Sequence, residues 1–142
     1  MFLSRYTALL AAPALLLAVA CQSTTSEQQP NQKLAAYAAS VSFPGNTHAE
    51  DSTNVGAVIE PGSKNVRIYN FGQNELDGSE VWLNSTFVYK VDSLPGKGVV
   101  SLRLADFYDH DGHSFADTTA TVSEVQVHAG DHVWKLLGPI NQ

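Results

Sequence analysis

The residues best suited to binding a metal ion lie in one stretch of the chain, between Leu104 and Trp134. This stretch contains six acidic residues and four of the five histidines, and it has no Lys or Arg. Carboxylates are the ligands that Ca²⁺ and Mg²⁺ prefer, and imidazoles suit Zn²⁺ and Cu²⁺. The stretch therefore raises the hypothesis of a cation-binding protein.

The most compact group of these residues is DHDGH, at 109–113. Its Asp-x-Asp-Gly start is typical of a Ca²⁺ loop, but such a loop also needs an oxygen ligand at position 5 and a Glu at position 12. Counted from Asp109, those positions are His113 and Ala120, so the pattern is incomplete. Because Asp-Gly is a strong turn dipeptide, we predict a tight turn whose flanking Phe107 and Phe115 pack into the core. A metal site in the 106–113 loop stays as the alternative, with candidate ligands Asp109, His110, Asp111 and His113.

A second pair of histidines, His128 and His132, has a spacing that depends on the turn between them. If residues 130–131 form a two-residue hairpin loop, Val127 lies opposite Trp134 and the two histidines point to opposite faces of the sheet. That register gives one apolar and one polar face, which is the pattern that fixes strand pairing. We therefore predict that the two histidines do not share a metal ion. The predicted core face holds Val125, Val127, Trp134 and Leu136, and the predicted solvent face holds Glu124, Gln126, His128 and Lys135.

Motifs for catalysis are absent from the sequence. It has no Walker phosphate loop, GxGxxG, GxSxG or HExxH, and no spacing of Ser, His and Asp that indicates an activated nucleophile. We predict that the protein is not an enzyme and uses no cofactor. A weaker hypothesis is a small hydrolase or glycan-binding module, which would need a concave pocket lined by carboxylates and by aromatic residues such as Trp82, Tyr69 and Tyr89.

The elements that must position these residues are short strands. Phe87, Tyr89 and Val91 alternate with Lys90 and Asp92, which is typical of an antiparallel sheet with one buried face. We predict an all-β fold, an immunoglobulin-like antiparallel sandwich of about seven strands with Trp82 as its core tryptophan. The likeness is one of architecture alone, since the cysteine pair of antibody domains is missing. The predicted strands cover 55–60, 65–71, 80–84, 87–94, 99–107, 121–129 and 132–138.

The chain divides into three parts, and two of them precede the predicted sandwich. Residues 1–20 have the charge and apolar pattern of a signal peptide, with Arg5 followed by an uncharged run that is shorter than the ~20 residues of a permanent membrane span. Residues 21–54 form an anchor and a polar tether and are partly ordered, since 34–43 fits either one short helix or a first strand. The sandwich itself covers 55–142.

The only cysteine, Cys21, directly follows the apolar run. The sequence Leu17-Ala18-Val19-Ala20-Cys21 resembles the lipobox of a bacterial lipoprotein precursor. This resemblance implies that the Cys21 thiol receives a diacylglycerol and that the mature chain begins at Cys21. Because Gln22 and not Asp follows the cysteine, it also implies sorting to the outer membrane, facing the periplasm. The alternative is ordinary secretion after Ala20, which would leave a free thiol in an oxidising compartment.

The net charge of the chain limits the kinds of partner that the protein is expected to bind. The chain carries a net charge of −6, and removal of Arg5 with the signal peptide makes the rest one unit more negative. Such an acidic domain is not expected to bind nucleic acid. We therefore predict a non-enzymatic, lipid-anchored envelope protein that acts as an interaction or structural module. Its expected partners are the bilayer, through acylated Cys21, and another envelope protein.

Overall fold

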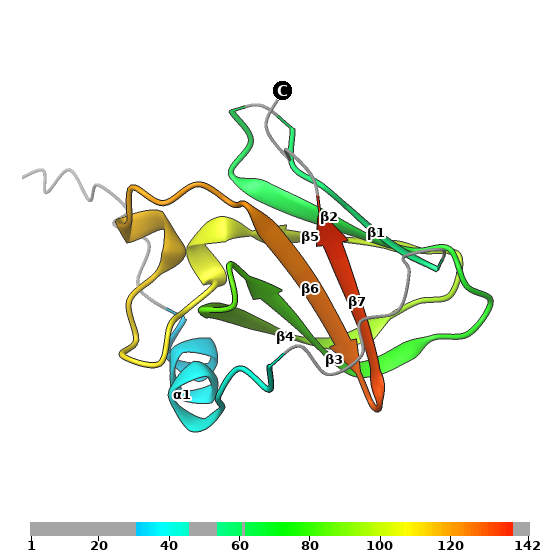
Figure 1. The fold of residues 1–142 in the computed structure, drawn as a ribbon, viewed down its shortest axis with the longest axis horizontal. Coiled ribbons are helices and arrows are strands. Elements are labelled where there is room, and N and C mark those ends of the chain that lie inside the picture. The colour runs from blue at the N-terminus through cyan, green and yellow to red at the C-terminus, as the bar shows by residue number, and fades with distance from the viewer. Residues whose placement is uncertain (1–30, 46–53, 61, 138–142) are drawn as a thin grey trace, which may run out of the picture.

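A computed structural model describes residues 31–45, 54–60 and 62–137, so the predicted signal peptide, Cys21 and most of the tether lie outside the described residues. The described residues form two antiparallel sheets packed face to face, with one helix on the outside (Figure 1). This arrangement confirms the predicted all-β sandwich. Two short 3₁₀ turns, η1 (Leu104–Asp106) and η2 (Phe115–Asp117), flank the 109–113 loop.

Seven strands are present among the described residues, as predicted. One sheet has the order β1-β2-β5 and the other the order β4-β3-β6-β7. The largest differences from prediction are in β3 and β5. β3 starts four residues earlier than predicted because Leu76 pairs with Leu94 of the long neighbouring strand. The strand predicted at 99–107 ends at Arg103 because the chain turns into η1 there. The strands are β1 (Val55–Val58), β2 (Asn65–Asn70), β3 (Leu76–Leu83), β4 (Phe87–Leu94), β5 (Val99–Arg103), β6 (Glu124–Ala129) and β7 (His132–Leu137).

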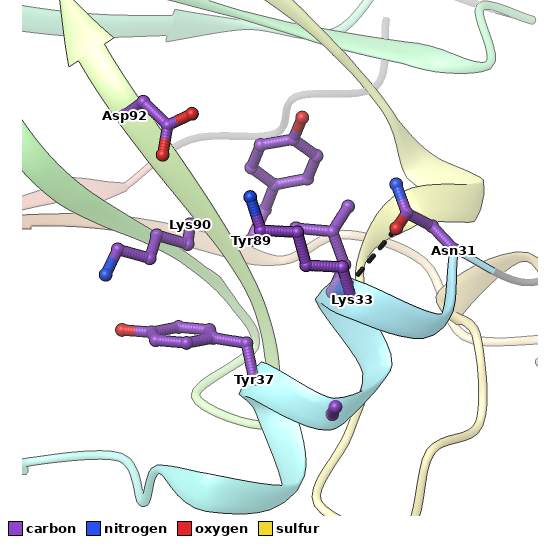
Figure 2. A pocket seen from close by; sticks show the side chains of 8 residues that line it. Asn31, Lys33, Tyr37, Tyr89, Lys90 and Asp92 are labelled. Carbon is purple, nitrogen blue, oxygen red and sulfur yellow. Dashed lines mark hydrogen bonds between the residues drawn. The ribbon is translucent and has the colours of Figure 1, made fainter.

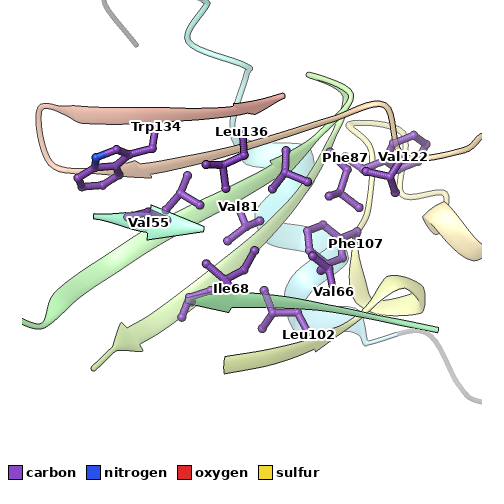
Figure 3. Packing of buried hydrophobic residues seen from close by; sticks show 14 of the residues in the cluster. Val55, Val66, Ile68, Val81, Phe87, Leu102, Phe107, Val122, Trp134 and Leu136 are labelled. Atoms are coloured by element: carbon purple, nitrogen blue, oxygen red, sulfur yellow. The ribbon is translucent and has the colours of Figure 1, made fainter. Parts of the chain in front are cut away.

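The core lies between the two sheets and is built from alternate residues of each strand (Figure 3). Val66 and Ile68 of β2 face the core from one side, and Val81 of β3 faces it from the other; all three are fully buried. Burial of each such side chain stabilises the fold by about 1.5–3 kcal/mol. Phe107 and Phe115 are also buried in this cluster, as predicted, and they fix both ends of the 109–113 loop.

The prediction for the core tryptophan is wrong. Trp82 is buried, but it lies on the outer face of the four-stranded sheet. Its strand neighbours Val81 and Leu83 occupy the core face, so the alternation of a strand turns Trp82 the other way. Trp134 of β7 contributes the tryptophan between the sheets (Figure 3).

The segment that fitted either a helix or a strand is a helix, α1 (Gln32–Ser40). It begins at Asn31, whose side chain accepts a hydrogen bond from the backbone N–H of Leu34, an ordinary N-cap interaction. The helix covers the outer face of the four-stranded sheet, on the side remote from β1 and β2 (Figure 1). This second apolar cluster contains Ala38, Trp82, Val88 and Tyr108, with Leu34, Ala35, Tyr37, Val41 and Phe43 packed against it.

The β6–β7 hairpin has the predicted register. Val127 pairs with Trp134 and Ala129 with His132, so His128 and His132 point to opposite faces. The predicted solvent face is wrong at two positions, because Gln126 and His128 are only 1% and 8% exposed. These side chains are buried because other residues cover this face of the sheet. The ring of Phe43, which follows α1, lies 5.9 Å from the His128 ring.

Candidate functional site

The 109–113 loop is a turn held together by the Asp109 carboxylate. Asp109 Oδ1 accepts hydrogen bonds from the backbone N–H groups of Asp111 (3.0 Å) and His113 (2.8 Å), and Oδ2 lies 3.1 Å from His113 Nδ1. Gly112 completes the turn with a φ of +84°, a conformation that favours glycine. Burial raises the pKa of Asp109, but the hydrogen bonds from His113 and Asp111 outweigh it and leave this pKa below its usual value.

Three of the four predicted metal ligands converge in this turn. Asp109, Asp111 and His113 each offer one ligand atom, and these atoms lie within 4.8 Å of one another. His110 is outside the group, although it lines a shallow cavity of about 300 Å³ beside Trp82 together with Asp109 and Asp111. Because both oxygens of Asp109 already accept hydrogen bonds, a cation would have to share the carboxylate with the turn.

A charged hydrogen-bond network fastens α1 to the sheet. The Glu80 carboxylate accepts hydrogen bonds from the Tyr37 hydroxyl and, at 2.9 Å, from the Trp82 indole N–H. The Lys90 ammonium lies 4.9 Å from the centre of the Tyr37 ring, a cation–π distance. Burial and the neighbouring Glu80 carboxylate raise the pKa of Tyr37 well above its ordinary value, so Tyr37 stays a hydrogen-bond donor at neutral pH.

A second series of hydrogen-bonded polar side chains, on the outer face of the four-stranded sheet, ends at His128. Lys135 Nζ lies 2.7 Å from Glu124, and Gln126 Nε2 donates to Glu124 Oε1 at 2.7 Å. The Gln126 carbonyl oxygen therefore faces His128 Nε2, 3.0 Å away, so Nε2 carries the proton of a neutral ring. Burial lowers the pKa of His128. Since Nε2 is bonded to an amide and not to a nucleophile, this arrangement orders the sheet face and does not form a catalytic dyad.

The outer face of the three-stranded sheet carries exposed apolar side chains, and no described element covers them. The three large hydrophobic residues that are exposed in the described part of the chain all lie here: Val58 (45%), Phe71 (53%) and Val99 (49%). Tyr69 pairs with Val99 across the sheet, and its ring stacks on that of Phe71 at 5.9 Å. We call Val58, Tyr69, Phe71 and Val99 the bare face. Two charged residues share this outer face: Arg67, the cross-strand partner of Val58, forms an ion pair with Glu60, and Arg103 forms one with Asp106.

The sequence reasoning missed the bare face, although a signal was present. Two apolar residues stand next to each other in Val58-Ile59 and again in Val99-Val100. Because neighbouring strand residues face opposite sides, one member of each pair must point away from the core. Outward-facing apolar residues on β1 and β5 could therefore have been predicted from the strand patterns.

The three aromatic residues predicted for a pocket do not come together. Tyr69 belongs to the bare face, Trp82 lies under α1, and Tyr89 lies on β4, the edge strand. Tyr89 instead lines a groove of about 550 Å³ between α1 and β4, together with Tyr37 and Asp92 (Figure 2).

Comparison of the chain with protein-family models, curated proteins and solved structures finds no match. The helices among the described residues are too short to cross a bilayer. The function is therefore argued from the surfaces of this fold.

Proposed function

We propose that the protein is a non-enzymatic, lipid-anchored envelope protein whose sandwich binds another envelope protein through the bare face. The observation that carries this proposal is the contrast between the two outer faces. Helix α1 buries one of them, while the other exposes Val58 of β1, Val99 of β5 and Phe71, which directly follows β2. Grouped exposed apolar side chains are typical of interaction sites.

The position of the tether supports a protein partner over the bilayer. The tether joins the domain at Asn31, at the start of α1, and α1 lies on the opposite side of the sandwich from the bare face (Figure 1). With Cys21 acylated, the bare face would point away from the membrane, into the space where other envelope proteins lie.

The anchor is tested by a Cys21→Ser variant of the full chain. We expect the wild-type protein to sediment with membranes and to be released only by detergent, because acyl chains add about 0.8 kcal/mol of membrane affinity per buried CH₂. The variant should be found in the soluble fraction. Membrane sedimentation of the variant, or a wild-type mass without acyl chains, would contradict the anchor.

The contact surface is tested by photo-crosslinking in the native envelope. A photoreactive residue is placed at Phe71 or Val99, and a matched control is placed at Ala39, which is exposed on α1. We expect both bare-face positions to crosslink to the same protein, the control position not to, and a Val58→Asp change to abolish the crosslink. Equal labelling from Ala39, or labelling of lipid only, would contradict the proposal.

Metal binding is a second candidate function, supported by the convergence of Asp109, Asp111 and His113. Thermal melts with Ca²⁺, Zn²⁺ or Cu²⁺ test it, because an ion at 100 times its Kd adds about 2.7 kcal/mol of stability. The shift should disappear in Asp111→Asn and persist in His110→Ala, the neighbour outside the cluster. No shift with any of the ions, or an equal shift in both variants, would remove this candidate.

A further inference from the structure

The free edge of β4 has backbone groups without a partner. The backbone of Val88 faces away from β3, because its N–H donates to the Tyr108 carbonyl at 2.9 Å and its carbonyl accepts from the Tyr108 N–H at 3.3 Å. In an antiparallel strand the groups that face one side recur at every second residue. The N–H and C=O groups of Lys90 and Asp92 therefore also face outward, and no backbone or side-chain group of the described residues pairs with them.

This unpaired edge borders the groove between α1 and β4. The groove has a volume of about 550 Å³, within the range of ligand-binding clefts. Figure 2 shows Lys33 reaching from the first turn of α1 toward the strand, where Tyr89, Lys90 and Asp92 follow one another. Leu34 and Ala36 of α1 add apolar surface to the lining. A groove between a helix and an unpaired strand edge is suited to an extended chain, which can pair with the strand while its side chains contact the helix.

The charges in the groove favour an acidic occupant. Lys33 and Lys90 line it from α1 and β4 together with one carboxylate, that of Asp92, and neither lysine forms an ion pair among the described residues. The Lys90 ammonium is held over the Tyr37 ring and keeps its hydrogen-bonding capacity. Two unpaired ammonium groups in one groove of an acidic domain are complementary to a carboxylate.

We propose that this groove binds an extended, acidic peptide segment of a partner protein, which adds as a further strand to the edge of β4. The peptide backbone pairs with the outward groups of Lys90 and Asp92, and this pairing supplies affinity as in other strand additions. A carboxylate of the peptide contacts Lys33 and Lys90, and an apolar side chain packs on Leu34. The groove and the bare face are separate surfaces, so this proposal does not depend on the function assigned to the bare face.

The charge requirement is tested by fluorescence anisotropy with the full-length protein in detergent. The probe is a labelled peptide, Glu-Val-Glu-Val-Thr, and Lys-Val-Lys-Val-Thr is its charge-reversed control. We expect saturable binding of the acidic peptide alone, weakened about tenfold or more by the double change Lys33→Glu and Lys90→Glu. Lys64→Glu, an exposed lysine outside the groove, should change the Kd by less than about twofold. No binding of the acidic peptide up to about 1 mM, or equal binding of both peptides, would overturn the proposal.

Strand addition is tested through the backbone. Asp92→Pro removes one outward N–H, and Pro is tolerated at solvent-facing positions of edge strands. Asp92→Asn keeps that N–H and is the matched control. We expect the proline variant to lose peptide binding about tenfold and the asparagine variant to keep it. If both variants bind as tightly as the wild type, the groove is only an anion site and the proposal fails.

A second measurement keeps the test decisive if Asp92→Pro unfolds. N-methylation of alternate peptide amides should abolish binding when it removes the N–H groups that face β4, and should have little effect at the positions between them. Binding that is insensitive to both methylation patterns would overturn the proposal. Sedimentation of the protein without peptide covers the other occupant: self-association that an Asp92→Pro change removes would assign the edge to a second copy of this chain and overturn the peptide assignment.

Discussion

The same substitution at the two tryptophans should have very different effects. Trp82 and Trp134 are 2% and 4% exposed, so a change to Phe removes a similar buried volume at each site. Their indole N–H groups differ: that of Trp82 donates to the Glu80 carboxylate at 2.9 Å, and that of Trp134 is buried and has no hydrogen-bond partner among the described residues. The difference between the two variants therefore isolates the hydrogen-bonding contribution.

The magnitude follows from those two environments. A hydrogen bond to a charged group contributes about 1.5–3 kcal/mol, so Trp82→Phe loses this amount in addition to the loss of volume. A buried unsatisfied donor costs about 1–3 kcal/mol, so Trp134→Phe recovers part of what it loses in volume. Because Glu80 is partly exposed and water can replace some of its bond, we expect Trp82→Phe to be less stable than Trp134→Phe by about 2–4 kcal/mol.

Urea denaturation followed by far-ultraviolet circular dichroism measures this difference. Equal urea dependence of the unfolding free energy in both variants shows that the same surface is exposed on unfolding, and it makes the two free energies comparable. If both variants lose the same stability, or if Trp134→Phe loses more, then the contrast between Trp82 bonded to Glu80 and Trp134 without a partner is wrong.

Three further predictions concern pH and backbone conformation. The raised pKa of Tyr37 means that its contribution to stability is complete below about pH 10 and is lost as pH rises beyond that value. Tyr37→Phe should therefore lose less unfolding free energy than the wild type between about pH 9 and 11, measured by urea titration. An equal loss in both proteins would contradict this. Burial lowers the pKa of His128 from 6.5, so stability should fall as pH drops below that value, and His128→Gln should lose less than the wild type between about pH 7 and 5; equal losses would count against a buried neutral ring. Asn84 has a φ of +51°, and its side chain accepts a hydrogen bond from the Ser123 N–H at 2.8 Å and donates one to the Thr121 carbonyl at 2.8 Å. Asn84→Ala should therefore lower the unfolding free energy, measured by chemical denaturation, by about 2–4 kcal/mol. A loss under about 1 kcal/mol would contradict this role.

The strands could be predicted because each one repeats its apolar side chains with the period of a half-buried sheet. β4 begins and ends where the alternation of Phe87, Tyr89 and Val91 indicated, and the hairpin around Gly130 has the register that pairs Val127 with Trp134. Local pattern and packing agree at these positions, so the sequence alone was sufficient.

The errors in predicted burial concern what covers the four-stranded sheet. Gln126 and His128 look like solvent-facing residues within β6, and Trp82 looks like a core residue within β3. What decides their burial is α1 and Phe43, more than 35 residues away in the chain and ambiguous between helix and strand in isolation. Tertiary packing of this kind is not encoded in the local alternation.

The candidate sites differ in the same way. The turn at Asp109 could be predicted because Asp-Gly and the following N–H groups are local, although which candidate ligands converge depended on the turn geometry that excludes His110. To predict the groove, one would have to know that α1 packs beside β4, so that Lys33 and Lys90 line the same hollow. The bare face required β1, β2 and β5 to be placed side by side, and the order of strands in a sheet is not readable from their separate patterns.

The most direct test of the central claim is the size of the complex that the protein forms in its own envelope. The full lipidated chain and a Phe71→Asp/Val99→Asp variant are extracted in mild detergent and compared by native gel electrophoresis, after melts show that both fold equally well. Because both side chains are about half exposed, the variant should keep the wild-type melting temperature. We predict that the wild type migrates with a partner and the variant migrates alone. The same complex in both would show that the bare face is not the interaction surface.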